Sequence, residues 1–144
     1  MERQRVLFLC AHNAARSQMA EALLRHHAGD QFEVCSAGLE PTEIHPMTRR
    51  VLEEAGIDTG ELVAEGLETY MAKVSVQCAI VVCERTQAQC PRFYPFARQT
   101  LYWPFEDPAN FSGSPEARLD KFREVRDQIE QRLVAWLSEL TVSR

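Results

Sequence analysis

Short apolar runs and longer amphipathic stretches alternate along the chain, and the short runs predict buried strands. Residues 6–9 and residues 77–83 are largely apolar and of strand length. Further strands are predicted at residues 31–36 and, more briefly, at residues 100–102. Apolar runs that do not alternate with polar residues are typical of strands covered on both faces, as in a parallel sheet.

Between these runs, apolar residues recur with the period of a helix. Helices are predicted over residues 17–25 and over residues 46–55, where Pro46 suits a first turn and Gly56 suits a stop. A long third helix begins near residue 114 with a credible N-cap. The apolar face of the first helix comprises Met19, Ala20, Leu23 and Leu24. The apolar stripe of the third helix, which we interpret as core, comprises Leu119, Phe122, Val125, Ile129, Leu133, Trp136, Leu137 and Leu140.

This alternation predicts an α/β fold, a three-layer sandwich in which a four-stranded parallel sheet has helices on both faces. Residues 61–73 fit this alternation of strands and helices less clearly. For them the sequence predicts a short extended segment followed by a short helix. With 144 residues the chain has the length of one domain, spanning residues 1–144. Ligands of such sheets bind beyond the carboxyl ends of the strands, where we expect Cys10, Cys83 and Trp103 to converge.

Candidate chemistry is concentrated between the first strand and the first helix, where residues 10–17 read Cys-Ala-His-Asn-Ala-Ala-Arg-Ser. Free backbone N–H groups and the positive end of the helix dipole favour an oxyanion at such a place. Cys10 supplies a nucleophile that acts as the thiolate, and Arg16 supplies a planar, permanently charged clamp. The predicted oxyanion-binding residues are Ala11, His12, Asn13, Ala14, Ala15 and Arg16.

Three residues of this loop also have a plain structural interpretation. Cysteine is among the most buried residue types, so the alternative for Cys10 is a packed residue at a strand end. We expect the hydroxyl of Ser17 to face the thiolate, but serine is also a preferred helix N-cap. His12 is interpreted as a surface imidazole.

Composition narrows the function classes. The net charge of −5 disfavours a polyanion-binding surface, so we expect no nucleic-acid partner. No segment approaches the roughly 20 apolar residues that span a bilayer, and no signal peptide is evident. We therefore expect a cytoplasmic monomer without a membrane partner. In a reducing cytosol the five cysteines are more readily catalytic, metal-binding or buried than paired in structural disulfides.

Cys83 ends a predicted strand, and Cys90 follows after a polar segment. One interpretation is a redox relay with Cys10, and another is two unconnected surface thiols. A zinc pair is disfavoured because no second pair completes the site. Cys35 and Cys78 lie within apolar strands, and we interpret them as packing residues.

Asp107 is the candidate general acid. It follows the aromatic residues Trp103 and Phe105 and precedes Pro108. An apolar surround favours the neutral carboxyl form, which suits a group that donates a proton. The alternative is a simple turn, because Asp before Pro is common in turns.

The pattern Cys-x5-Arg-Ser after a first strand, followed by Gln-Met-Ala-Glu, resembles the low-molecular-weight protein tyrosine phosphatase fold. More specifically, it resembles the thioredoxin-coupled arsenate reductases built on that fold. The likeness extends along nearly the whole chain. It includes Val-Cys-Ser-Ala-Gly at residues 34–38, a helix and its exit at 46–58, a cysteine segment at 83–91, an acid loop at 103–109 and a helix start at 122–127.

This resemblance implies reduction of arsenate to arsenite, with phosphate or sulfate as substrate analogues and no tightly bound cofactor. Arsenate is held by the loop and Arg16, Cys10 attacks arsenic, and Asp107 protonates the departing oxygen. Cys83 then attacks Cys10, and Cys90 attacks Cys83. Thioredoxin reduces the final disulfide, which the third cysteine is expected to bring to the surface.

Some related reductases bind a monovalent cation, which implies a potassium site at Asn13, Glu21, Ser36 and Glu65. Oxygen ligands suit a hard cation. Each residue has an alternative as a turn, helix surface, cap or exposed acid. Asn13 is alternatively a brace for the loop, whose inward-facing amides require an unusual backbone conformation.

Two other function classes share these residues. A tyrosine phosphatase uses Cys10 and Asp107 but hydrolyses a phosphocysteine with water, which leaves the two later cysteines idle. Phosphatases of this fold carry aromatic residues just after the Asp-Pro pair, whereas alanine and asparagine follow here. An oxyanion or redox sensor uses the same cysteines without turnover.

Overall fold

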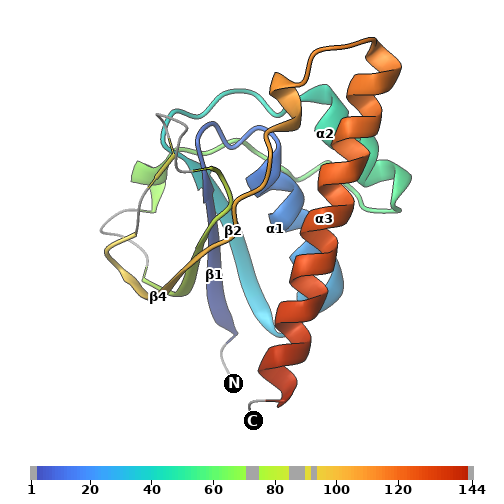
Figure 1. Ribbon diagram of the computed structural model, residues 1–144. Helices are drawn as coiled ribbons and strands as arrows, with labels where there is room; N and C mark the ends of the chain where they lie inside the picture. Colours follow the sequence, from blue (N-terminus) through green and yellow to red (C-terminus); the bar gives the residue numbers. More distant parts are fainter. Residues whose placement is uncertain (1–2, 71–74, 85–89, 92–93, 143–144) are drawn as a thin grey trace.

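A four-stranded parallel sheet organises the molecule, as the sequence predicted (Figure 1). The computed structural model describes residues 3–70, 75–84, 90–91 and 94–142. In the sheet the strands follow the order β2-β1-β3-β4, so the first strand and the third form its centre. The strands are β1 (Gln4–Cys10), β2 (Phe32–Gly38), β3 (Val76–Val81) and β4 (Ala97–Tyr102).

The two central strands are the most apolar because both of their faces are covered. In β1 the side chains from Val6 to Cys10 are buried, and in β3 four consecutive residues from Cys78 to Val81 are buried. Val6 pairs with Val34 on one side and with Cys78 on the other. Edge strand β4 has no buried residue, since three of its residues are exposed and three are half-buried.

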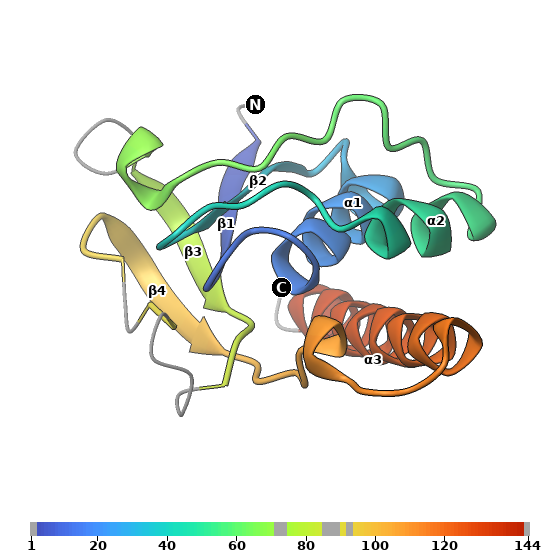
Figure 2. The same ribbon diagram turned by 90° about the horizontal axis from the view of Figure 1, so that it is seen from above.

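Helical segments lie on both sides of the sheet (Figures 1 and 2). Helices α1 (Arg16–Ala28) and α3 (Pro115–Val142) lie side by side on one face, and α2 (Pro46–Glu54) packs against both of them. The short 3-10 turn η1 (Leu67–Thr69) lies on the opposite side. A second 3-10 turn, η2 (Pro108–Asn110), contacts α3.

The predicted apolar faces are core. Met19, Ala20, Leu23 and Leu24 of α1 are fully buried, and the Ser114 hydroxyl accepts a hydrogen bond from the backbone N–H of Ala117 at the start of α3. Two members of the α3 stripe, Leu137 and Leu140, are only partly buried. The buried members are Leu119, Phe122, Val125, Ile129, Leu133 and Trp136.

Element boundaries differ from the predicted ones by a few residues. β2 extends two residues past Ser36, because Ala37 and Gly38 still pair with β1. β3 ends at Val81, before Cys83. The ambiguous stretch from residue 61 contains an isolated bridge between Gly38 and Gly66 and then η1; residues 71–73 of that stretch lie outside the described residues.

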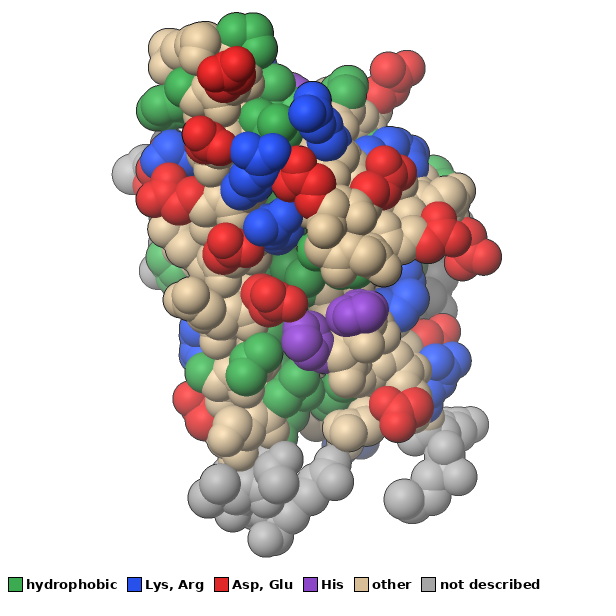
Figure 3. Space-filling model, turned by 90° about the vertical axis from the view of Figure 1, so that its right-hand side faces the viewer, with side chains coloured by type: hydrophobic (Ala, Val, Ile, Leu, Met, Phe, Trp, Pro, Cys, Tyr) green, Lys and Arg blue, Asp and Glu red, His purple; other side chains and the backbone are tan. Residues whose placement is uncertain are grey.

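Charged side chains of both signs alternate on the helical face instead of gathering by sign (Figure 3). Arg123 of α3 pairs with Glu54 of α2 at 2.7 Å and with Asp120 at 2.7 Å, and Lys121 pairs with Glu106 and Glu124. Hydrogen bonding to Arg123 lowers the pKa of Glu54. Among the described residues, no helix combines the length and the apolar character that crossing a bilayer requires.

The start of α2 is held by a histidine cap. His45 Nδ1 accepts a hydrogen bond from the backbone N–H of Met47 at 3.1 Å, and Pro46 occupies the first turn. The imidazole ring packs on Phe122 of α3, with ring centroids 4.7 Å apart. Burial lowers the pKa of His45 from its ordinary value, and the nearby Arg118 lowers it further against the opposing effect of Asp107. Only the neutral ring can accept this bond.

We expect acid to weaken the α2 cap through His45. Because folding lowers the pKa of His45 below 6.5, the unfolded chain binds the proton more readily. The stabilisation is fully present above pH 6.5 and is lost as the pH falls through the folded-state pKa. The check is the free energy of unfolding by urea as a function of pH, in wild type and in His45→Asn.

Asparagine caps helices well but does not titrate, so the variant should lose less stability on acidification. His45→Ala should lose about 1 kcal/mol near neutral pH, the usual cost of removing a cap. Identical pH profiles for wild type and His45→Asn would contradict this account of the cap.

Candidate functional site

The candidate site lies at the carboxyl ends of the strands, where β1 gives way to α1. Cys10 is the last residue of β1, and Arg16 is the first residue of α1. Leu9 pairs with Val81, and Val81 with Tyr102, so Cys83 and Trp103 emerge at the same edge of the sheet. The predicted convergence of Cys10, Cys83 and Trp103 at one edge is therefore present.

The carbonyl groups of the loop between Cys10 and Arg16 point outward. Backbone N–H groups of residues 39–45 donate to four of them over 2.9–3.3 Å, and Gln18 Nε2 donates to the carbonyl of Asn13 at 3.0 Å. In a trans peptide the N–H points away from the C=O. The amides of residues 11–15 are thereby turned inward, toward one centre. The four backbone pairs are Leu39 with Cys10, Glu40 with Ala11, Thr42 with His12, and His45 with Ala14.

Asn13 braces the loop from inside. Its φ of 55° places it in the left-handed region, which is rare for a residue other than glycine. Its Nδ2 donates to Ser17 Oγ at 2.8 Å and to Ser36 Oγ at 2.9 Å. Its Oδ1 accepts from the Glu65 N–H at 2.8 Å and from Gln18 Nε2 at 2.9 Å. Asn13 is fully buried, so this network holds the strained residue in place.

The Cys10 sulfur is held at the mouth of the loop by two contacts. Ser17 Oγ lies 2.8 Å from Cys10 Sγ, and the backbone N–H of Asn13 donates to that sulfur at 3.3 Å. The N-cap of α1 is Ala15, which makes no side-chain capping bond. Ser17 therefore faces the sulfur, as expected, and does not act as the cap.

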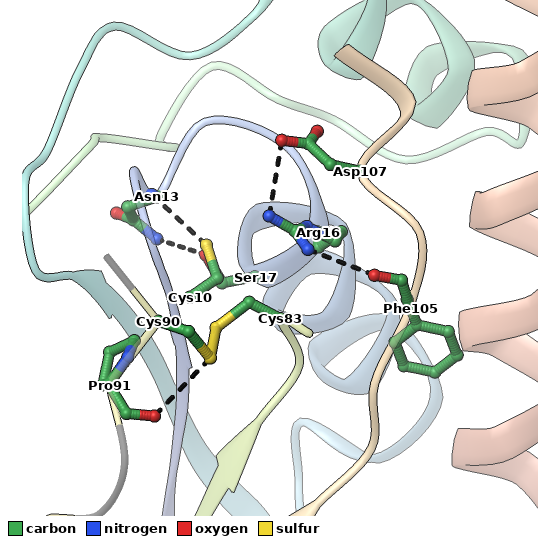
Figure 4. Close-up of a disulfide and its surroundings, with 9 residues drawn as sticks. All are labelled: Cys10, Asn13, Arg16, Ser17, Cys83, Cys90, Pro91, Phe105 and Asp107. Carbon is green, nitrogen blue, oxygen red and sulfur yellow. Dashed lines mark hydrogen bonds and ion pairs between the residues drawn. A yellow bond between two sulfur atoms is a disulfide. The ribbon is translucent and has the colours of Figure 1, made fainter. Parts of the chain in front are cut away.

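Arg16 and Asp107 form a pair across the site (Figure 4). Arg16 Nη2 lies 3.4 Å from Asp107 Oδ2, and Nη1 donates to the Phe105 carbonyl at 3.1 Å. Asp107 Oδ1 also accepts from the Ala109 N–H at 3.0 Å and caps η2. The carboxyl thus lies between a guanidinium and an amide, not in the apolar surround that its aromatic neighbours predicted.

Cys83 and Cys90 form a disulfide, with Cα atoms 5.8 Å apart (Figure 4). This pairing replaces the interpretations as a zinc pair and as unconnected thiols. Cys83 is fully buried and Cys90 is 6% exposed. The expectation that this disulfide lies at the surface is therefore wrong, because both sulfur-bearing residues are packed into the core cluster.

The remaining thiols are packing residues with high pKa values. Burial raises the pKa of Cys35 to about 12, with a further contribution from Glu21. Burial raises the pKa of Cys78 to about 11. Neither thiol ionises near neutral pH, which agrees with the interpretation of both as packing residues.

The four residues expected at a cation site come together beneath the loop but bind one another. Ser36 Oγ donates to Glu21 Oε1 at 2.6 Å, while Asn13 directs its amide nitrogen to Ser36. Glu21 also pairs with Arg25 at 2.6 Å, and the Tyr70 hydroxyl donates to Glu65. In this arrangement the oxygens already face protein donors and do not form an open cage for a potassium ion.

A cavity of about 450 Å³ opens above the loop. Its walls include Cys10, Arg16 and Asp107 together with His12 and Ala109, and among its described lining residues there is no Phe, Tyr or Trp. His12 is half-buried, and its Nδ1 lies 3.0 Å from the Glu40 carbonyl. The cavity presents polar groups and small side chains, which suits a small oxyanion better than an aromatic ring.

Sequence reasoning missed three residues that shape the site from behind. Gln18 is fully buried and donates to the loop, although its Oε1 has no partner among the described residues. The hydroxyl of buried Thr48 donates to the Ala14 carbonyl at 3.0 Å. Gly38 passes the loop backbone at close range. Gln18 and Gly38 stand in the motifs of the family resemblance, but no role was assigned to either, and nothing in the sequence singled out Thr48.

Gly38→Ala should disrupt the loop. A Cβ at this position would lie 2.6 Å from the Asn13 nitrogen and 2.7 Å from the His12 carbonyl carbon. Because both atoms belong to the backbone, the loop itself must shift. We expect a loss of about 1–3 kcal/mol in unfolding free energy, typical of overpacking, together with loss of the thermal stabilisation that sulfate confers.

Gly60→Ala is the matched control, because its Cβ meets only the Asp58 carboxylate at 3.3 Å. This variant should respond to sulfate as wild type does. A Gly38→Ala protein that is stabilised by sulfate as strongly as wild type would contradict the role of the close approach.

Comparisons with known proteins agree with this geometry. A family model for low molecular weight phosphotyrosine protein phosphatases matches residues 5–144. The curated arsenate reductase of Bacillus licheniformis is 33% identical over 133 residues, which cover 92% of this chain and 94% of the relative.

Solved structures extend the likeness to three dimensions. An arsenate reductase in the phosphate binding state matches with a TM-score of 0.75 at 28% identity, over 94% of this chain and 98% of that one. The thioredoxin-dependent arsenate reductase Cg_ArsC1' of Corynebacterium glutamicum matches with a TM-score of 0.71 at 28% identity, over 99% of this chain and 64% of that one. With its Cys10–Arg16 loop and a match over nearly its whole length, the chain belongs to the low molecular weight phosphotyrosine protein phosphatase family.

Proposed function

We propose that this protein reduces arsenate to arsenite. The observation that carries the proposal is the Cys83–Cys90 pair beside the Cys10 loop. A phosphatase needs only the loop thiol and an acid, whereas a reductase must also supply two electrons from thiols. Relatives described as arsenate reductases, among them proteins at 29% and 33% identity, support the same choice.

In the first step arsenate occupies the cavity above the loop. The inward amides of residues 11–15 and the Arg16 guanidinium hold its oxygens, as expected for an anion at a helix N-terminus. The Cys10 thiolate attacks arsenic, and Asp107 protonates the oxygen that departs. For this step the Arg16 guanidinium contacts the substrate, while Asp107, whose Oδ2 lies 3.4 Å from Arg16 Nη2, acts from the cavity wall.

In the second step Cys83, as a thiolate, attacks the sulfur of Cys10. A Cys10–Cys83 disulfide forms, and the electron pair of the broken sulfur–arsenic bond stays on arsenic, which leaves as arsenite. Cys90 then attacks Cys83, frees the Cys10 thiolate and leaves the Cys83–Cys90 disulfide. The described arrangement corresponds to this last state.

The relay requires movement of the segment that carries Cys90. Because the Cys83 sulfur bonds one partner at a time, Cys90 must separate from Cys83 while Cys83 bridges Cys10, and each bridge needs Cα atoms within about 7 Å. The buried position of the pair also shields it from a reductant. A dithiol protein such as thioredoxin, the donor named for the Corynebacterium glutamicum neighbour, must therefore meet an opened form of this segment. This donor implies action in the cytoplasm.

Cys83→Ser and Cys90→Ser should each abolish sustained turnover. Without Cys83 no thiol releases arsenite, and without Cys90 the Cys10–Cys83 disulfide stays buried. The assay follows arsenate-dependent NADPH oxidation with thioredoxin and thioredoxin reductase. We expect at least a hundredfold loss in both variants, as is usual when a nucleophile is removed.

Cys35→Ser is the matched control, because the Cys35 thiol has a pKa near 12 and no role in the relay. It should turn over as wild type does. Undiminished turnover in Cys90→Ser would contradict a three-cysteine relay.

The second candidate is a tyrosine phosphatase, favoured by the family model that matches the chain. The loop thiol, Arg16 and Asp107 serve that chemistry equally well. The absence of Phe, Tyr and Trp from the described cavity walls argues against a grip on an aromatic ring. Weak hydrolysis of aryl phosphates is expected as a side reaction, because phosphate and arsenate share shape and charge.

Asp107→Asn tests the shared first step. Asparagine keeps the size of the side chain but donates no proton to the leaving oxygen. We expect both arsenate reduction and aryl phosphate hydrolysis to fall about 10²- to 10⁴-fold, the usual contribution of a general acid. Unchanged rates for both substrates would remove Asp107 from the mechanism.

A further inference from the structure

The peptide group between Ala14 and Ala15 is held more tightly than its neighbours in the loop. The Ala14 carbonyl accepts two hydrogen bonds, from the backbone N–H of His45 at 3.1 Å and from the hydroxyl of Thr48 at 3.0 Å. A carbonyl oxygen has two lone pairs, so both are engaged. The orientation of this peptide plane is therefore set by the start of α2.

The start of α2 is a rigid base for this contact. His45 caps the helix, and Val51 and Leu52 one turn further on are fully buried in the core. Thr48 lies in the first turn and is itself fully buried, so its hydroxyl is shielded from water.

The opposite side of the same peptide faces the cavity. Because the peptide is trans, fixing the Ala14 carbonyl toward α2 turns the Ala15 N–H the other way. Ala14 and Ala15 both line the cavity that also contains Cys10 and Arg16. Thr48 does not line it, so any effect of Thr48 on an anion must pass through the loop backbone.

We propose that Thr48 is a positioning residue for the oxyanion site. By holding the Ala14 carbonyl, Thr48 directs the Ala15 N–H toward the bound anion. This inference rests on the oxyanion site of the proposed function and adds a residue outside the cavity to it. Thr48 touches neither substrate nor the reacting sulfur. It restricts the loop to the conformation in which its amides converge.

The test measures sulfate binding by isothermal titration calorimetry at constant pH and ionic strength. Sulfate keeps its charge across the neutral range, so protonation of the ligand does not enter. Thr48→Val preserves the shape of the side chain but removes the hydroxyl. We expect its dissociation constant for sulfate to rise about threefold to tenfold, the range that one hydrogen bond contributes. Thr48→Ser restores the donor and should bind within about twofold of wild type.

Val51→Ala separates positioning from stability. It removes buried methyl groups from the same helix but no hydrogen bond to the loop, so it should lower the melting temperature and leave the sulfate dissociation constant unchanged. In the thioredoxin-coupled assay, Thr48→Val should raise KM for arsenate with little change in kcat, since the amide binds ground and transition states alike. A merely structural role for Thr48 would not produce this split.

The outcomes distinguish this inference from the function on which it rests. Equal sulfate affinity in wild type and Thr48→Val overturns the role of Thr48 and leaves the oxyanion site intact. A parallel loss of affinity in Val51→Ala also overturns it, because the effect would then follow stability. Wild type that binds neither sulfate nor arsenate overturns the oxyanion site and the role of Thr48 together.

Discussion

The outward turn of the loop carbonyls is the constraint on which the rest of the site depends. Backbone N–H groups of residues 39–45 and the side-chain amide of Gln18 engage the carbonyls from Cys10 to Ala14, which turns the loop amides inward. The requirement for glycine at position 38 and the left-handed backbone of Asn13 both follow from fitting two backbones this closely. The proposed anion site does not require a basic protein, because its donors act locally within a chain of net charge −5.

The Cys83–Cys90 pair has a different constraint. The proposed reaction requires it to lie close to the loop, whereas its reduction requires it to be accessible. Cys83 and Cys90 lie next to the loop, and their burial limits access to the disulfide from outside, including access by the proposed protein reductant. The proposed relay therefore requires that Cys83 and Cys90 become accessible during turnover. The loop has the opposite requirement, because it binds an oxyanion only when it holds one conformation. Thr48 and Asn13 stabilise that conformation through their hydrogen bonds.

Sequence patterns predicted the features that depend on local chemistry. The apolar runs located the strands, and Cys10 and Arg16 fell at a strand end and a helix start because the loop between them joins those elements. Contacts between distant segments were not predictable. The partners of Asp107, the burial of the disulfide and the bond from Thr48 to the loop depend on packing that no local period encodes.

The most direct measurement is an NMR titration of the ¹⁵N-labelled protein with sulfate. The account predicts that the largest shifts fall on the backbone amides of residues 11–15 and on the Arg16 guanidinium, because these donors are turned toward one centre. Shifts centred instead on the arginines at the amino ends of the strands, Arg3, Arg5 and Arg98, would contradict it, as would the absence of any shift in the loop.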